Sequence, residues 1–188
     1  VIMVTGISAV LMSSLGASRL KSSRQKTTYS ALAQAKEALV SYAITYGDTH
    51  TGQVHGYLPC PDMDGKDISG NPAEGATKLS CGAKNVSAIG RLPWKTLELP
   101  TLRDGGGECL WYAVAGTYKH NPKTDLMNED NSGLFEMLDP NGATISQNVV
   151  AVVFTPGSVV GSQNRSPDGA APVCGGNYTS NNYLDNVA

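Results

Sequence analysis

The spacing of the four cysteines says most about which chemistry this chain can carry out: Cys60, Cys81, Cys109 and Cys174. None of them forms the C-x-x-C pair of a zinc site or a redox motif, so disulfides formed in an oxidising compartment are the better interpretation. Of the three connectivities, we favour Cys60 with Cys81, which closes a local loop, and Cys109 with Cys174, which ties the end of the chain to its middle. The alternative is four buried free thiols in a cytosolic protein.

Three closely spaced aspartates, Asp62, Asp64 and Asp67, lie around the turn residue Gly65 and suggest a calcium site. Carboxylates on one turn can direct several hard oxygens at one cation. The pattern is incomplete, because Lys66 stands where a calcium loop needs an acid or an amide, and no suitably placed Glu closes the site. The alternative is a solvated turn whose aspartates bind local backbone amides.

No arrangement of residues predicts catalysis, so we expect no catalytic residue, no enzyme activity and no cofactor other than the calcium considered above. The three histidines form no H-E-x-x-H ligand pattern, and no G-x-S-x-G nucleophile motif occurs. Gly105, Gly106 and Gly107 lead into a strand rather than a helix, so they predict a tight turn and not a phosphate loop. Asp104 and Glu108 flank this turn beside Arg103, which favours a structural salt bridge over a catalytic pair.

The charge is distributed unevenly along the 188 residues, although the net charge is only -2. Residues 1–46 carry five basic side chains and one acidic side chain, a net +4, and the remainder carries -6. This asymmetry argues against a general nucleic-acid binder and allows attraction between the basic part of one copy and the acidic part of another. With 21 Gly and 10 Pro, we expect one loop-rich domain with a modest core.

The first 18 residues carry no charge and are apolar enough to enter a bilayer, although a spanning helix needs about 20 residues. The apolar residues of this segment are Val1, Ile2, Val4, Ile7, Val10, Leu11 and Leu15. Because the chain does not begin with Met, we expect residues upstream to have been removed or left out. A secretory signal peptide and a plain single-pass anchor carrying an unrelated periplasmic domain are the alternatives.

The helix is predicted to continue to Tyr46, because neither Gly nor Pro occurs between Ala17 and that residue, and to end at Gly47. Residues recurring at spacings of 3 and 4 form one stripe that we expect to pack on the rest of the protein: Leu32, Ala35, Leu39, Tyr42 and Tyr46. The domain organisation is therefore an N-terminal helix over 1–46, apolar over about 1–20 and amphipathic over about 21–46, followed by a head over 47–188.

The head is predicted to be loop by composition up to about residue 82, with its core between residues 88 and 115. We expect strands over Cys109–Val114 and Asn148–Phe154, the latter buried on both faces, and a third strand near Ile145 or Tyr118. The tail from Pro156 is expected to be surface loop held by Cys174. The fold class is α+β: a long helix packed by its C-terminal half on a small antiparallel sheet, in a loop-rich, disulfide-stapled head.

Several segments resemble the type IV pilin superfamily, which includes pilus subunits and the pseudopilins of type II secretion, and in particular pilin-like proteins of Gram-negative bacteria. These segments span Ala31 to Asn186: ALAQAKEALVSYA, YLPCPDMDG, GRLPWKTLELPTLRDGGGECLWYAVAG, CGGN and NNYLDN. The resemblance implies a leader removed by a prepilin peptidase, residence in the inner membrane before assembly, and a periplasmic or extracellular filament assembled by a cytoplasmic ATPase. In that filament the apolar helices of many copies, or of other pilins, form the core.

Val1 and Thr5 stand where pilins usually carry Phe and, four residues later, Glu. Either the mature start lies upstream or this is a minor subunit without that Glu, and no role is transferred to these two positions. Three functions are therefore carried forward: a structural filament subunit, a minor pseudopilin-like subunit of a type II secretion system, and a tip adhesin or ligand-binding subunit that uses the Cys60–Cys81 loop, with or without calcium.

Overall fold

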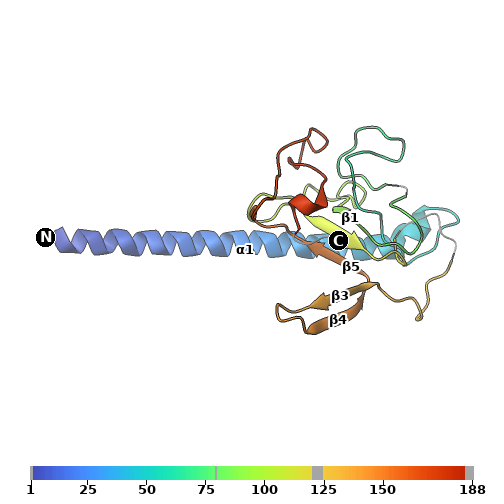
Figure 1. The fold of residues 1–188 in the computed structure, drawn as a ribbon, viewed down its shortest axis with the longest axis horizontal. Coiled ribbons are helices and arrows are strands. Elements are labelled where there is room, and N and C mark those ends of the chain that lie inside the picture. Colours follow the sequence, from blue (N-terminus) through green and yellow to red (C-terminus); the bar gives the residue numbers. More distant parts are fainter. Residues whose placement is uncertain (1, 79, 120–124, 185–188) are drawn as a thin grey trace.

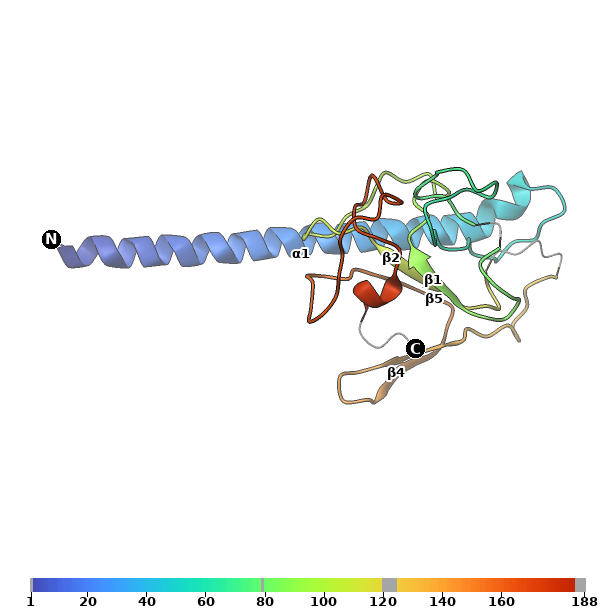
Figure 2. The same ribbon diagram turned by 45° about the horizontal axis from the view of Figure 1, so that its top comes forward.

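One helix, α1 (Ile2–Thr49), extends through the whole length of the computed structural model, and the head is built around its C-terminal half (Figures 1 and 2). The structure describes residues 2–78, 80–119 and 125–184, and of residues 2–17 it describes the backbone only. A helix of 48 residues is about 72 Å long at about 1.5 Å per residue. Its N-terminal half therefore projects well beyond the head.

The prediction that α1 ends at Gly47 is wrong, because the helix continues to Thr49. The imidazole of His55 packs against Gly47, where an added Cβ would lie 2.9 Å from His55 Cε1. His55 Nδ1 is 2.6 Å from the carbonyl oxygen of Ile44, and the amide of Gly56 donates to the carbonyl of Ala43 at 2.8 Å. The missing side chain thus makes room for a loop that folds back onto the last turns of the helix and contacts their carbonyl groups.

The main sheet is antiparallel and has three strands in the order β1-β2-β5: β1 (Ala88–Arg91), β2 (Trp111–Val114) and β5 (Ala151–Phe154). The central strand β2 is fully buried and starts two residues later than predicted. A strand does form over Ile145, but it belongs to a separate sheet, and the third strand of the main sheet is β1 instead. Gly90 of β1 passes so close to the chain at Asp62 that an added Cβ would lie 2.5 Å from its carbonyl oxygen.

The predicted strand Asn148–Phe154 is divided between two sheets. Asn148 has a left-handed backbone with φ of 59°, a conformation that Asn tolerates better than most residues. It lies within β4 (Thr144–Val149), which pairs with β3 (Phe135–Leu138) in a separate two-stranded hairpin, and β5 begins only at Ala151. The expected burial on both faces is also wrong, because β5 is half-buried and most of β4 is exposed.

The hydrophobic core lies between α1 and the main sheet. Ala31, Ala35 and Leu39 contribute from the helix, and Tyr112 and Val114 contribute from β2. Loop residues complete the core: Leu58, Leu92, Leu97, Leu102 and Leu110. The chain is therefore α+β, with an N-terminal helix packed on small antiparallel sheets.

Two disulfides staple the loops of the head, with the predicted connectivity confirmed: Cys60–Cys81 and Cys109–Cys174. They close loops with sequence separations of 21 and 65 residues. Because Cys60 and Cys81 are buried among core residues, the first disulfide also belongs to the core. Such bonds form in an oxidising compartment, which is typical of periplasmic and extracellular proteins.

Candidate assembly surface

One face of α1 holds the head. Ala35 and Leu39 are buried in the core, Tyr46 is buried, and Leu32 and Tyr42 are half-buried against the core, so all five residues of the predicted packing stripe lie on this face. The rings of Tyr42 and Tyr46 are 4.9 Å apart. Burial raises the pKa of the Tyr42 hydroxyl far above its ordinary value, with the neighbouring Tyr46 adding to the rise.

A second face of the same helix is apolar and remains exposed. Five residues spaced by 4, 3, 4 and 4 positions share this face: Tyr29, Ala33, Lys36, Val40 and Ile44. The large apolar members Tyr29, Val40 and Ile44 are 63%, 48% and 62% exposed. The sequence analysis missed this stripe, although its residues follow the same spacing of 3 and 4 as the packing stripe, shifted by one residue along the helix. A helix with two apolar faces can bind the head on one and another partner on the other.

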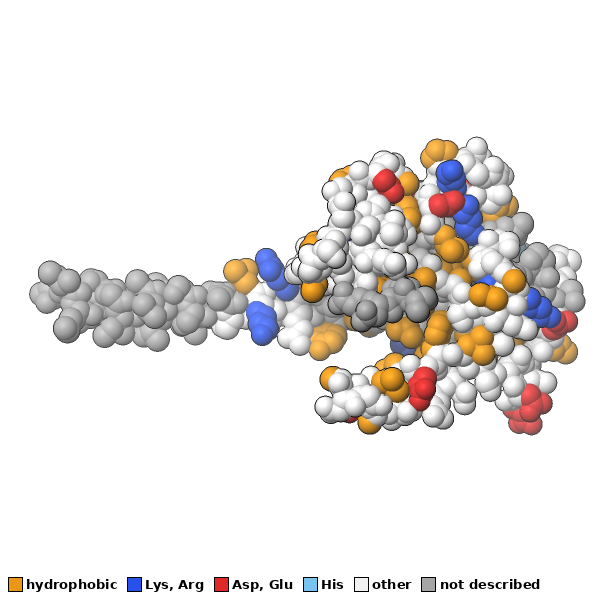
Figure 3. All heavy atoms as spheres, viewed as in Figure 1, with side chains coloured by type: hydrophobic (Ala, Val, Ile, Leu, Met, Phe, Trp, Pro, Cys, Tyr) orange, Lys and Arg blue, Asp and Glu red, His pale blue; other side chains and the backbone are white. Residues whose placement is uncertain are grey.

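The part of α1 just outside the head forms a basic collar, which we define as residues 18–28. Its charged side chains are all exposed and all positive: Arg19, Lys21, Arg24 and Lys26. Figure 3 shows Lys and Arg side chains on the stalk where it leaves the head. The head reaches the collar at Gly105, whose amide donates to Thr28 Oγ1 at 2.9 Å. An added Cβ at Gly105 would lie 2.2 Å from the carbonyl oxygen of Arg24, so this turn needs glycine to approach the helix.

The predicted apolar segment of α1 lies outside the side chains that the structure describes. This applies to Val1, Ile2, Val4, Ile7, Val10, Leu11 and Leu15. Within the described part of the chain, no helix combines the length and the apolar character needed to cross a membrane.

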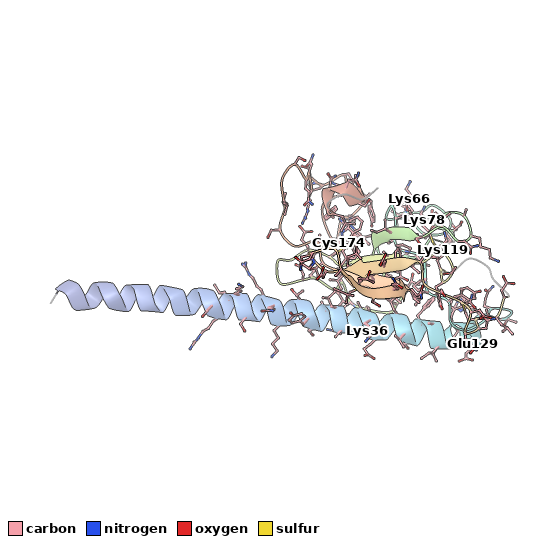
Figure 4. All side chains as sticks on the ribbon, turned by 60° about the horizontal axis from the view of Figure 1, so that its bottom comes forward. Lys36, Lys66, Lys78, Lys119, Glu129 and Cys174 are labelled. Carbon is pink, nitrogen blue, oxygen red and sulfur yellow. A yellow bond between two sulfur atoms is a disulfide. The ribbon has the colours of Figure 1, made fainter. Side chains whose placement is uncertain are left out.

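An apolar groove of about 590 Å³ runs between α1, the strand β5 and the β3–β4 hairpin. The helix contributes Leu32, Ala33, Lys36, Leu39 and Val40, and the other walls are Leu58, Met137 and residues 150–153. Figure 3 shows the hollow between the hairpin and the body of the head, and Figure 4 shows Lys36 on the helix beside the head. Lys36 is the single charged residue among those that line the groove.

The three aspartates of the predicted calcium site have separate partners. Asp62 is buried and accepts hydrogen bonds from the amides of Gly65 (2.9 Å) and Gly75 (2.6 Å) and from the Tyr178 hydroxyl (2.7 Å). Burial raises the pKa of Asp62, and these hydrogen bonds oppose the rise.

The other two aspartates of this set are engaged near the surface. Asp64 pairs with Lys78 at 2.6 Å, and Asp67 accepts from the amides of Ser69 and Asn71. Among the described residues, no group of three or more His, Cys, Asp or Glu side chains is placed to hold a metal ion. These contacts resemble the solvated-turn alternative, and calcium stays a prediction.

A buried arginine ties the C-terminal tail to the sheet, and the sequence analysis did not find it. Arg91 of β1 is 3% exposed, and its guanidinium carbon lies 5.0 Å from the ring centre of Tyr178 and 5.5 Å from that of Tyr183. Its Nη2 donates to the carbonyls of Gly175 and Asn177 at 2.6 and 3.0 Å. The tail is therefore held by more than Cys174, which was the single anchor expected.

The charged residues around the glycine turn are structural, but their pairing differs from the prediction. Glu108 pairs with Arg165 at 3.2 Å, not with Arg103. Asp104 instead accepts hydrogen bonds from the amides of Gly106 and Glu108. Arg103 donates to the carbonyls of Gly107 and Val173, so it joins the turn to the tail.

The two described histidines have separate contacts. His50 stacks on Tyr46 with ring centres 3.9 Å apart, and His55 lies against the last turn of α1. His120 lies outside the described residues.

The described surface thus offers a basic collar, an exposed apolar stripe and an apolar groove, all suited to contacts between proteins. Comparison with known proteins adds no relative, because no family model, curated protein or solved structure matches this chain.

Proposed function

We propose that this chain is a non-enzymatic structural subunit of a type IV pilin-like filament, anchored in the inner membrane of a Gram-negative bacterium before assembly. The observation that carries the proposal is the single helix Ile2–Thr49, of which the C-terminal half is built into the head while the N-terminal half projects from it (Figure 1). The backbone of the projecting half lies apart from the head (Figure 1), and bundling with the rods of other copies would give it a partner.

Two further observations support this proposal. The exposed apolar stripe runs along the part of the helix that carries the head, and it extends the surface that other copies can contact. Val40 and Ile44 of this stripe are 48% and 62% exposed. Contiguous exposed apolar surface of this kind is typical of interaction sites. The disulfides suit a head displayed in the periplasm or outside the cell.

The proposal is tested by deleting residues 1–18 and expressing the truncated and full-length chains in a host that assembles filaments. The truncated chain should be soluble and folded, with both disulfides formed and native near-ultraviolet circular dichroism, yet absent from sheared fibres. The full-length chain is the matched control and should be present in the fibres. Normal incorporation of the truncated chain would contradict the proposal.

Abundance in the same fibres separates a major from a minor subunit. A major pilus subunit should dominate the sheared material by mass spectrometry, whereas a pseudopilin-like minor subunit should be scarce beside another pilin.

A further inference from the structure

The strand β5 presents an open backbone edge to the apolar groove. Because the amide of Ala115 donates to the carbonyl of Val150 at 2.8 Å, and polar groups alternate along an antiparallel strand, residues 150, 152 and 154 direct their backbone groups toward β2. The N–H and C=O groups of Ala151 and Val153 therefore point away from β2. No hydrogen bond joins these groups to another residue within the described chain.

The side chains confirm that this edge faces the groove. Residues 150–153 alternate between the two faces of the sheet, yet all four line the same groove. This is the arrangement expected when the groove lies along the strand edge. An occupant of the groove thus meets unpaired backbone groups on one wall and the apolar residues Leu32, Ala33 and Val40 of α1 on another.

The β3–β4 hairpin pairs with no further strand within the described residues. It forms its own two-stranded sheet, in which both outer edges are open, and a two-stranded sheet alone is marginally stable in water. Large apolar side chains on the hairpin and just before it are exposed: Leu134 50%, Met137 43%, Leu138 53% and Ile145 61%. The hairpin also carries Glu136, which accepts hydrogen bonds from Thr144 and Gln147 and has no ion-pair partner among the described residues.

The hairpin cannot place β4 on the β5 edge of its own chain. Val150 alone separates the two strands, whereas antiparallel neighbours need a connection of at least about two residues. A second copy is free of this restriction.

We propose that the β3–β4 hairpin of one copy adds to the β5 edge of the next copy and places its Glu136 carboxylate beside the Lys36 ammonium of that copy. This inference rests on the proposed filament function, because it names the contact between neighbouring heads. Met137 of β3 lines one wall of the groove, so the hairpin borders the groove of its own chain while its outer edge remains able to pair with another copy. When each copy accepts a hairpin from one neighbour and donates its own to another, such contacts propagate into open assemblies.

The charges of the two surfaces are complementary. Lys36 is the single charged residue lining the groove, and it has no acidic partner among the described side chains. Strand addition satisfies the open backbone groups of Ala151 and Val153, as in other peptides that bind at sheet edges. The exposed apolar side chains of the hairpin would at the same time be buried.

Charge reversal in the full-length chain, purified in a neutral detergent, tests this contact. Lys36→Glu alone and Glu136→Lys alone should each weaken self-association by about tenfold in sedimentation velocity, because each variant places like charges together. An equimolar mixture should regain the association of the unaltered chain, because each variant's groove then meets a hairpin of opposite charge. Both residues are exposed, so neither change should unfold the head.

The strand-addition step is tested separately with Val153→Pro, which removes an N–H that points into the groove without touching the ladder to β2. It should abolish self-association while the near-ultraviolet circular dichroism stays native. Val159→Pro, at an exposed position of a loop, is the control and should associate normally.

The possible failures are distinguishable. If the unaltered chain and all variants associate equally, or if the mixture stays as weak as its components, the hairpin contact is overturned while the filament proposal stands. If the unaltered chain stays monomeric at every concentration, the hairpin contact is overturned as well, and incorporation into sheared fibres decides the filament proposal independently.

Discussion

Two adjacent residues of α1 lie on different faces of the helix. Leu39 lies on the face that holds the head, and Val40 lies on the exposed face. Leu39 is 5% exposed and belongs to the core, whereas Val40 is 48% exposed and lines the groove. Leu39→Ala removes buried methyl groups and leaves a cavity between the helix and the sheet. We therefore expect the free energy of unfolding of the head to fall by about 3 kcal/mol.

Truncating Val40 to Ala should have the opposite effects: little loss of stability but a loss of assembly. Its side chain is about half exposed, so Val40→Ala should change the free energy of unfolding by less than about 0.5 kcal/mol. It should nevertheless reduce incorporation into sheared fibres, because it removes apolar surface from the groove and from the exposed stripe. Leu39→Ala should reduce incorporation only through loss of folded protein.

Thermal unfolding followed by near-ultraviolet circular dichroism measures the stability difference, since Trp111 lies in the buried central strand. For a chain of this size, about 3 kcal/mol lowers the midpoint temperature by roughly 6–12 °C. Equal midpoints for Leu39→Ala and the unaltered chain, or a larger loss for Val40→Ala, would refute the assignment of the two helix faces.

Three further predictions concern the head. Replacing Cys109 and Cys174 together with Ser opens a loop of 65 residues and should cost about 4 kcal/mol in the chain-entropy model, measured by urea unfolding of the full chain. Arg91→Lys keeps the charge but loses the planar stacking, and it should destabilise the head by about 2–4 kcal/mol and speed proteolysis within residues 156–184; unchanged cleavage would contradict the tail-anchoring role. Backbone amides hold the pKa of Asp67 and Asp139 below the ordinary range, so these groups stabilise the fold above about pH 4 and lose that effect on further acidification. Converting both to Asn should flatten the fall of the midpoint temperature below pH 4, and an unchanged slope would argue against it.

The features that the sequence could predict are those decided by local chemistry. The run without Gly or Pro up to Tyr46 favours a continuous helix whatever surrounds it, and the spacing of Leu32, Ala35 and Leu39 identifies one face of it. The disulfide pairing followed from loop closure, and the strand around Trp111 followed from its run of large apolar residues. Each of these signals lies within a few helical turns or within the order of the cysteines along the chain.

The features that were missed depend on contacts between distant segments. The helix continues past Gly47 because His55 packs on it, and β1 is recognisable as a strand only when it is paired with β2 and close to Asp62. Likewise, Arg91 is a core residue only because the rings of Tyr178 and Tyr183 are brought around it.

The sequence by itself determined the rod, the stapled head and the face of the rod that carries the head, because helix propensity, periodicity and cysteine spacing act over short distances. The tertiary structure alone decided which surfaces stay open. The predicted strand is divided at Val150 into the end of a separate hairpin and an edge strand. Because a single residue connects them, β4 cannot pair with β5 of the same chain, and the β5 edge stays open to the groove.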